Sequence, residues 1–165
     1  MTAGDSPRVL GPHDGNRVDL GAFGVRFMVL AEESGGGFSM VEHPIPPRML
    51  AAPLHRHSRE DEYSYVIEGT MGALLGDTVV FAKPGDLVFK PRHQWHTFWN
   101  AGDTPCRILE IISPGGFEDM FAEMGRHPEA FMGEAAAAMD ARFGLEVDYG
   151  SIERLCHEHG LTFPA

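Results

Sequence analysis

The hydrophobic pattern divides the chain into a long β-like part and a shorter helical part. From Val18 onward, short runs rich in β-branched and aromatic residues alternate with turn residues, a pattern typical of strands in an all-β fold. After Pro114-Gly115-Gly116, apolar residues recur at spacings of three and four, which is the period of an amphipathic helix. Strands first and helices last predict one mostly β domain that carries helices at its C-terminal end.

The expected strands are short and are separated by recognisable turns. The triple glycine at 35–37 and the Gly76-Asp77 pair both predict hairpin loops. Pro44, Pro46 and Pro47 exclude a central strand and indicate an edge or crossover segment. The strands are expected at residues 18–20, 25–31, 38–42, 63–67, 71–75, 78–82, 87–90, 95–99 and 107–112, with a further strand around His55.

The two ends of the chain differ from this β region. Residues 1–17 are rich in Gly, Pro, Asp and Asn, which predicts a loose arm with at most one short strand at 8–10. Helices are expected at 117–124, at 129–143 and from 151 to about 159, the last capped by Ser151 and ended by Gly160. The prediction is therefore an arm (1–17), a barrel (18–116) and a helical extension of the same domain (117–165).

Composition narrows the functional classes. A length of 165 residues and a hydrophobic share of 43% fit one globular domain. The net charge of −11 disfavours nucleic-acid binding, because an acidic surface repels phosphates, and no basic patch or long apolar run indicates a membrane. With no visible signal peptide, the expected compartment is the cytoplasm, where Cys106 and Cys156 would be free thiols.

One stretch carries a candidate metal site. His55 and His57 stand at i and i+2, so on a strand their imidazoles leave from the same face and can reach one ion. Glu62 and His96 would complete a four-residue set if they arrived on adjoining strands of the same sheet. The alternative is a pair of surface histidines in a polar loop, but Glu62 and His96 would then need separate explanations.

The full spacing resembles a known family. It reads His55-x-His57-x4-Glu62-x6-Gly69, then Gly85-x5-Pro91-x4-His96-x3-Asn100, with residues 70–84 between the two blocks. This resembles the two barrel motifs of the cupin superfamily. The resemblance implies a double-stranded β-helix, or jelly-roll barrel, holding one metal ion through three histidines and one glutamate, and it implies a homodimer.

One position departs from the family pattern. The second motif usually has glycine two residues after its proline, where this chain has His93. A turn that needs positive φ accepts His better than most residues with a side chain. We interpret His93 as a turn residue, with a role behind a metal ligand as the alternative.

The ligand types leave the metal open. Nitrogen and oxygen donors with vacant coordination positions suit a divalent transition metal; Fe, Ni or Mn is favoured here, and Zn, Co or Cu also fits. Glu60 and Asp61 could replace Glu62, but the motif spacing selects Glu62 and its neighbours are expected to be solvated.

Alternation along the strands predicts a pocket beside the ion. Ser64 and Val66 share a face with Glu62, and Phe98 and Asn100 share a face with His96, although Val66 and Phe98 could be core residues only. The other face carries Tyr63, Tyr65, Trp95 and Trp99, which are expected to contact other strands, the helices or a partner subunit.

The ligand set and the segment after the barrel resemble quercetin-dioxygenase-like cupins. This implies an O₂-dependent cleavage of a small enol- or catechol-type molecule chelated to the metal, with Glu62 acting both as ligand and as proton acceptor. Two alternatives stay open: a non-catalytic cupin that binds or senses a small molecule, and a metal-dependent isomerase or cyclase.

Overall fold

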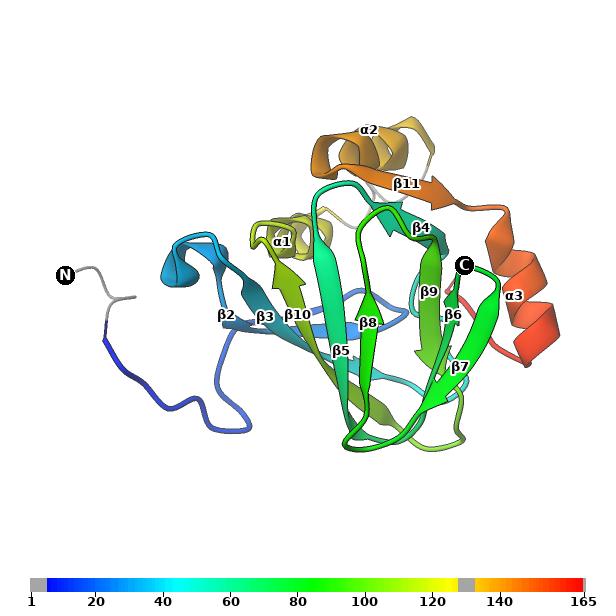
Figure 1. Ribbon diagram of the computed structural model, residues 1–165, viewed down its shortest axis with the longest axis horizontal. Helices are drawn as coiled ribbons and strands as arrows, with labels where there is room; N and C mark the ends of the chain where they lie inside the picture. Colours follow the sequence, from blue (N-terminus) through cyan, green and yellow to red (C-terminus); the bar gives the residue numbers. More distant parts are fainter. Residues whose placement is uncertain (1–5, 128–132, 165) are drawn as a thin grey trace.

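The chain folds into two antiparallel β-sheets that face each other in a jelly roll (Figure 1). The computed structural model describes residues 6–127 and 133–164. The first sheet contains, in spatial order, β1 (Arg17–Asp19), β2 (Gly24–Val29), β3 (Ser39–Ile45), β10 (Cys106–Ser113), β5 (Asp61–Glu68) and β8 (Leu87–Lys90). The second contains β11 (Leu145–Asp148), β4 (Leu54–His57), β9 (His96–Asn100), β6 (Met71–Leu75) and β7 (Thr78–Ala82). The predicted mostly β jelly roll is confirmed.

Apolar side chains from both sheets meet between them. Val41, Val66 and Ile108 come from the first sheet and Met71 and Phe98 from the second, and all five are buried. Each such side chain stabilises the fold by about 1.5–3 kcal/mol through its removal from water. The alternation that predicted these strands is therefore the alternation that fills the core.

Both predicted hairpins are present. β2 and β3 are joined through the 3-10 turn η1 (Ala31–Ser34) and the glycines that follow it, and β6 and β7 through Gly76-Asp77. Gly35 and Gly76 have φ values of 65° and 60°, which glycine adopts without the steric cost that a side chain would bring. The strand expected to reach residue 31 ends at Val29, because the chain turns there into η1.

The proline-rich segment corrects one prediction. The strand expected to end at residue 42 continues to Ile45, and β3 lies inside the sheet between β2 and β10 with Pro44 opposite Arg107. The pairing of β3 with β2 begins only at Glu42, opposite Arg26. Pro44 thus lies where β3 pairs on one side only, so its missing N–H removes no bond to β2.

The C-terminal part contains α1 (Glu118–Arg126), α2 (Gly133–Phe143) and α3 (Ser151–His159). The expected start of the second helix at Glu129 lies outside the described residues. The sequence pattern gave no sign of β11, which pairs with β4 and brings Leu145 opposite His57. Ser151 is the first residue of α3 and does not cap it: its hydroxyl accepts the Leu54 N–H at 2.9 Å and so links α3 to β4.

The helices contact the barrel in two ways. α3 lies against the outer face of the second sheet, where His159 stacks on Trp99 with ring centroids 4.5 Å apart (Figure 1). From α1, Met120 and Phe121 belong to the main core, and Phe117 just before the helix contacts the His57 ring at 4.5 Å. The C-terminal segment therefore covers the end of the barrel at which His57 lies.

The described part of the N-terminal arm, blue in Figure 1, lies beside the barrel and leads into β1. Residues 8–10 form no strand. Arg8 bonds Glu33 and the Met28 carbonyl, and Arg26 bonds the carbonyls of Gly11 and Asp14, so side chains hold the arm to β2 and η1.

Candidate metal centre

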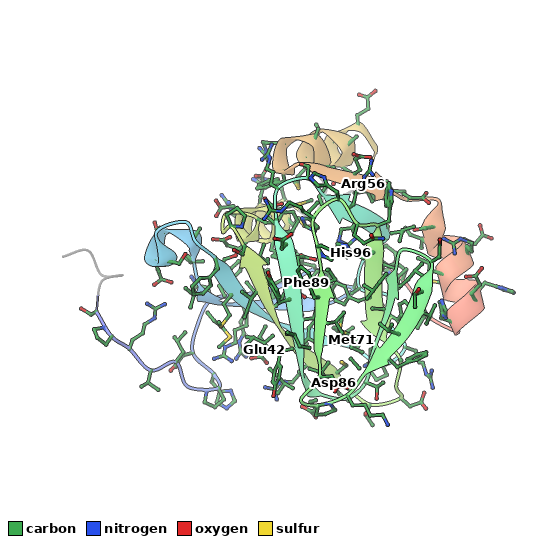
Figure 2. All side chains as sticks on the ribbon, in the orientation of Figure 1. Glu42, Arg56, Met71, Asp86, Phe89 and His96 are labelled. Atoms are coloured by element: carbon green, nitrogen blue, oxygen red, sulfur yellow. The ribbon has the colours of Figure 1, made fainter. Side chains whose placement is uncertain are left out.

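Three strands bring the four predicted ligands together inside the barrel. His55 and His57 leave β4 on the same face, His96 lies opposite His55 on β9, and Glu62 comes from β5. The expectation that Glu62 shares a sheet with His96 is wrong, because β5 belongs to the facing sheet. The closed barrel lets a carboxylate reach across to three imidazoles. Figure 2 shows His96 toward the end of the barrel near β11 and α2, and Met71 toward the other end.

The donor atoms are close enough for one ion. One ligand atom from each of the four residues lies within 4.8 Å of all the others. All four residues are buried, with exposed fractions between 1% and 8%. Two donors that each bond one metal at about 2.1 Å can be at most about 4.2 Å apart, so small side-chain adjustments would suffice.

The hydrogen bonds of His55 and His96 fix which nitrogen faces inward. Nδ1 of His55 lies 2.8 Å from the Pro53 carbonyl, and Nδ1 of His96 lies 2.9 Å from the Gln94 carbonyl. A carbonyl oxygen only accepts, so each Nδ1 carries the proton and each Nε2 presents a lone pair. This is how metal-binding histidines are commonly oriented.

His57 has a different neighbour. Its Nδ1 lies 3.4 Å from Glu60 Oε2 and its Nε2 lies 3.4 Å from Glu62 Oε1. Both ring nitrogens are buried and have no hydrogen-bond partner among the described residues. A buried polar atom without a partner is costly, and a metal ion bound at Nε2 would remove that cost.

The contact between His96 and Glu62 also fits a shared cation. His96 Nε2 lies 3.0 Å from Glu62 Oε2. Burial lowers the pKa of His96, and a neutral ring with its proton on Nδ1 would face the carboxylate with a lone pair. Two lone pairs repel unless a proton or a metal ion lies between them. The residues present therefore fit a divalent ion held by three neutral imidazoles and one carboxylate.

Electrostatics keep the ligands in their metal-binding forms. Burial, together with the neighbouring His96 and His57, lowers the pKa of His55 well below 6.5, so the ring is neutral at physiological pH. Burial alone would raise the pKa of Glu62, but the positive charge of the adjacent Lys90 lowers it well below 4.5. Glu62 is therefore ionised.

Sequence reasoning missed a buried charged cluster behind Glu62. Lys90 of β8 is 1% exposed, and its Nζ lies 3.0 Å from Glu62 Oε2 and 3.1 Å from Glu110 Oε2. The Ser64 hydroxyl donates to the same Glu110 oxygen at 2.7 Å. Alternation in β8 could have revealed Lys90, since it shares the inward face with Val88 while Leu87 and Phe89 are exposed. We name Lys90, Glu110 and Ser64 the Lys90 cluster.

The acidic neighbours of Glu62 behave differently from each other. Glu60, expected to be solvated, is 6% exposed and faces His57, so that expectation is wrong. Asp61 points outward and binds Arg92 through both carboxylate oxygens. His93 adopts φ 67° on an exposed turn, as the sequence indicated, and its N–H donates to the His57 carbonyl at 2.7 Å.

The four predicted pocket residues are all buried, with Val66 and Phe98 in the main core. Ser64 is bonded to Glu110. The Asn100 amide donates to the carbonyls of Ile45 and Thr104, so it links the end of β3 to the segment before β10. Their part in substrate binding stays a prediction.

His43, which the sequence pattern left without a role, lies deep in the barrel. It is 1% exposed, its Nδ1 lies 3.1 Å from the Gly24 carbonyl, and it packs against the rings of Phe23 and Phe121. Burial lowers its pKa to about 4. It is a neutral core histidine at physiological pH.

Comparisons with known proteins agree with this architecture. Residues 42–112 match the family described as the cupin domain. The tetracenomycin polyketide synthase protein TcmJ of Streptomyces glaucescens is 33% identical over 60 residues, which cover 36% of this chain and 40% of TcmJ.

Solved structures share the fold at low sequence identity. KdgF from Halomonas superposes with a TM-score of 0.61 at 18% identity, covering 70% of this chain and 99% of KdgF. The polyketide cyclase RemF from Streptomyces resistomycificus gives a TM-score of 0.57 at 24% identity, covering 66% of this chain and 80% of RemF. No helix among the described residues has the length and apolarity needed to cross a membrane. The match to the cupin domain thus covers residues 42–112, and the solved structures share the jelly-roll fold with this chain.

Proposed function

We propose that the chain is a metal-dependent enzyme that binds a small enolisable molecule, such as a β-diketone or phenol of polyketide type, and catalyses its cyclisation or isomerisation. The observation that carries this proposal is the buried set of His55, His57, Glu62 and His96, whose donor atoms face one another. A bound divalent ion would supply Lewis acidity toward a carbonyl or enol oxygen.

The protein's own groups would handle the proton. We assign Glu62 as the acceptor because it is ionised and its Oε1 is not bonded to Lys90. A C–H bond next to a substrate carbonyl would break with its proton moving to Oε1, and the resulting enolate carbon would attack a second carbonyl of the same molecule. The proton would then return to the new alkoxide oxygen, so the ring closure is balanced without an oxidant.

The reaction class is supported by likeness to two proteins. TcmJ is by name a polyketide synthase protein and RemF a polyketide cyclase. The cyclase alternative is therefore preferred here to the dioxygenase that the motif resemblance alone implied. The second candidate remains an O₂-dependent cleavage of an enol- or catechol-type molecule, which the three-histidine, one-glutamate set favours.

Turnover of a panel of linear and bicyclic β-diketones, flavonols and catechols by metal-loaded protein tests both candidates. We expect products that have the mass of the substrate, or that mass less one water molecule. They should form at equal rates with and without O₂. Stoichiometric O₂ uptake would support the dioxygenase, and no turnover with measurable ligand binding would support a binding or sensing role. Glu62→Gln is expected to retain most of the metal and to lose turnover, and unchanged turnover would remove the acceptor role of Glu62.

We also propose a homodimer. The outer face of β5 and β8 exposes large apolar side chains, namely Tyr65, Ile67, Leu87 and Phe89. Such a patch is unusual on a monomer and typical of an interface. Light scattering should give twice the chain mass of 18.1 kDa, and Leu87→Glu should give the single-chain mass. A wild-type protein at the single-chain mass would contradict this proposal.

A further inference from the structure

The Lys90 cluster places buried charged groups beside the metal site that are not needed as metal ligands. Three histidines and one glutamate already supply four donors, yet a buried lysine and a second buried carboxylate lie directly behind them. A buried charge is expensive and is kept only when it is closely paired. The pairing of Lys90 with Glu62 therefore indicates a role for this lysine at the metal site.

The strand register places Lys90 against Glu62. Glu62 and Lys90 lie opposite each other in the pairing of β5 with β8, and Ser64 and Glu110 lie opposite each other in the pairing of β5 with β10. All four side chains point into the barrel from neighbouring positions of three adjacent strands. The contact is thus fixed by the sheet itself.

The Lys90 ammonium is paired with two carboxylates and lies near an aromatic ring. Nζ bonds Glu62 at 3.0 Å and Glu110 at 3.1 Å, and it lies 4.7 Å from the centre of the Phe98 ring, within range of a cation–π contact. An ammonium group has three N–H donors, and the two carboxylates account for two of them. The partners of Lys90 point to a role in holding Glu62.

Glu110 in turn holds Lys90. Its Oε2 accepts from both Lys90 and the Ser64 hydroxyl, while its Oε1 is buried without a hydrogen-bond partner among the described residues. Two bonds on one oxygen fix the position of the ammonium between the two carboxylates. A turn of the Glu62 carboxylate away from this ammonium would break its bond to Lys90.

We propose that Lys90 is a positioning residue for the metal ligand Glu62: by bonding Oε2 and being anchored by Glu110, it sets the orientation in which the Glu62 carboxylate meets the ion. This inference rests on the proposed metal centre but not on the class of reaction. Glu62 would thus meet a bound ion in the orientation that its bond to Lys90 sets.

The visible absorption of Co(II)-loaded protein tests this proposal, because cobalt bands report the number and arrangement of ligand atoms. The variants are Lys90→Met and the double variant Lys90→Met/Glu110→Met. The double variant removes both members of the buried Lys90–Glu110 pair, and the bound cobalt ion balances the charge of Glu62 that remains. It is therefore expected to fold even where Lys90→Met alone does not. Lys83→Met is the matched control, because Lys83 is the other lysine of the chain and is exposed.

We expect both Lys90 variants to show the same shift of the cobalt bands, and Lys83→Met to match the wild type. A wild-type spectrum in the double variant would overturn the proposal, since Lys90 would then only balance buried charge. Wild-type spectra in both variants would overturn it as well. Absence of protein-bound cobalt in the wild type would instead refute the metal centre itself.

Discussion

The two faces of β5 and β8 reverse the usual distribution of side chains. The inward face carries Glu62, Ser64 and Lys90, and the outward face carries Tyr65 and Phe89, which are 43% and 48% exposed. Charged groups inside a barrel cost free energy unless they are paired, and each of those inside is within hydrogen-bond distance of another. This contrast indicates that the inner face of β5 and β8 serves a polar site at one end of the barrel. The outer face is suited to contact with a second copy of the chain.

The largest effect is expected from breaking the inner pair. Lys90→Met leaves Glu62 and Glu110 buried without their cation, which should lower the free energy of unfolding by about 3–5 kcal/mol. The measurement is urea denaturation of metal-free protein at neutral pH. The double variant Lys90→Met/Glu110→Met should recover the part of this loss that comes from Glu110, while Glu62 still lacks its cation. A single variant as stable as the wild type would contradict the account.

His43 predicts a pH dependence of stability. The unfolded chain protonates this histidine below about 6.5, but the folded chain does so only below about 4, because burial disfavours the charged ring. Stability should therefore fall as the pH drops through this window, by about 3 kcal/mol in total from this residue.

The variant His43→Phe isolates that contribution. Glu110 acts in the opposite direction, since burial raises its pKa to about 7 and the stability it adds is lost as the pH rises through that value. As the pH drops from about 7 to about 3, the free energy of unfolding of the wild type should fall by about 3 kcal/mol more than that of His43→Phe. Parallel curves would show that His43 does not titrate as described.

Glu60 should affect the metal without being a ligand. Its Oε2 lies 3.4 Å from Nδ1 of His57, so Glu60 would orient the ring of a metal ligand. Removing a group that orients a metal-binding histidine usually weakens metal binding by about 10- to 100-fold. Competition with a chromophoric chelator would measure this for Glu60→Ala. Asp61→Ala, which removes a carboxylate bonded to the side chain and the backbone N–H of Arg92 and to no histidine, is the matched control and should bind the metal as the wild type does.

The smallest effect on stability is expected from a substitution on the outer face of β8. Leu87 is 59% exposed, so Leu87→Glu should change the free energy of unfolding of the separated chain by no more than about 0.5 kcal/mol. Denaturation at a protein concentration at which the chains are separate gives this value. A loss of several kcal/mol would mean that the outer face supports the monomer and not a partner.

Much of the fold could be predicted because its signals are local. Two-residue alternation, the turn residues at Gly76-Asp77 and the change to a helical period after Gly116 each depend on neighbouring positions. The four ligand candidates were also found from spacing, because two strand residues at i and i+2 must share a face.

What could not be predicted depends on which strands become neighbours. Glu62 reaches the histidines from the facing sheet, and Lys90 and Glu110 meet although 20 positions separate them. β11 is recognisable only through its pairing with β4, far away in the sequence. The burial of Glu60 likewise follows from its place beside His57, which alternation and charge alone did not reveal.

The central claim is that four buried side chains hold one metal ion, and metal analysis tests it most directly. Protein purified without an affinity tag or chelator, then supplied with Fe, Mn, Ni, Co, Cu or Zn in turn, should retain about one ion per chain for at least one of these metals. The variant His55→Ala/His57→Ala, checked by circular dichroism for an unchanged fold, should retain almost none. A folded wild-type chain that retains no ion, or a double variant that retains as much as the wild type, would contradict the account.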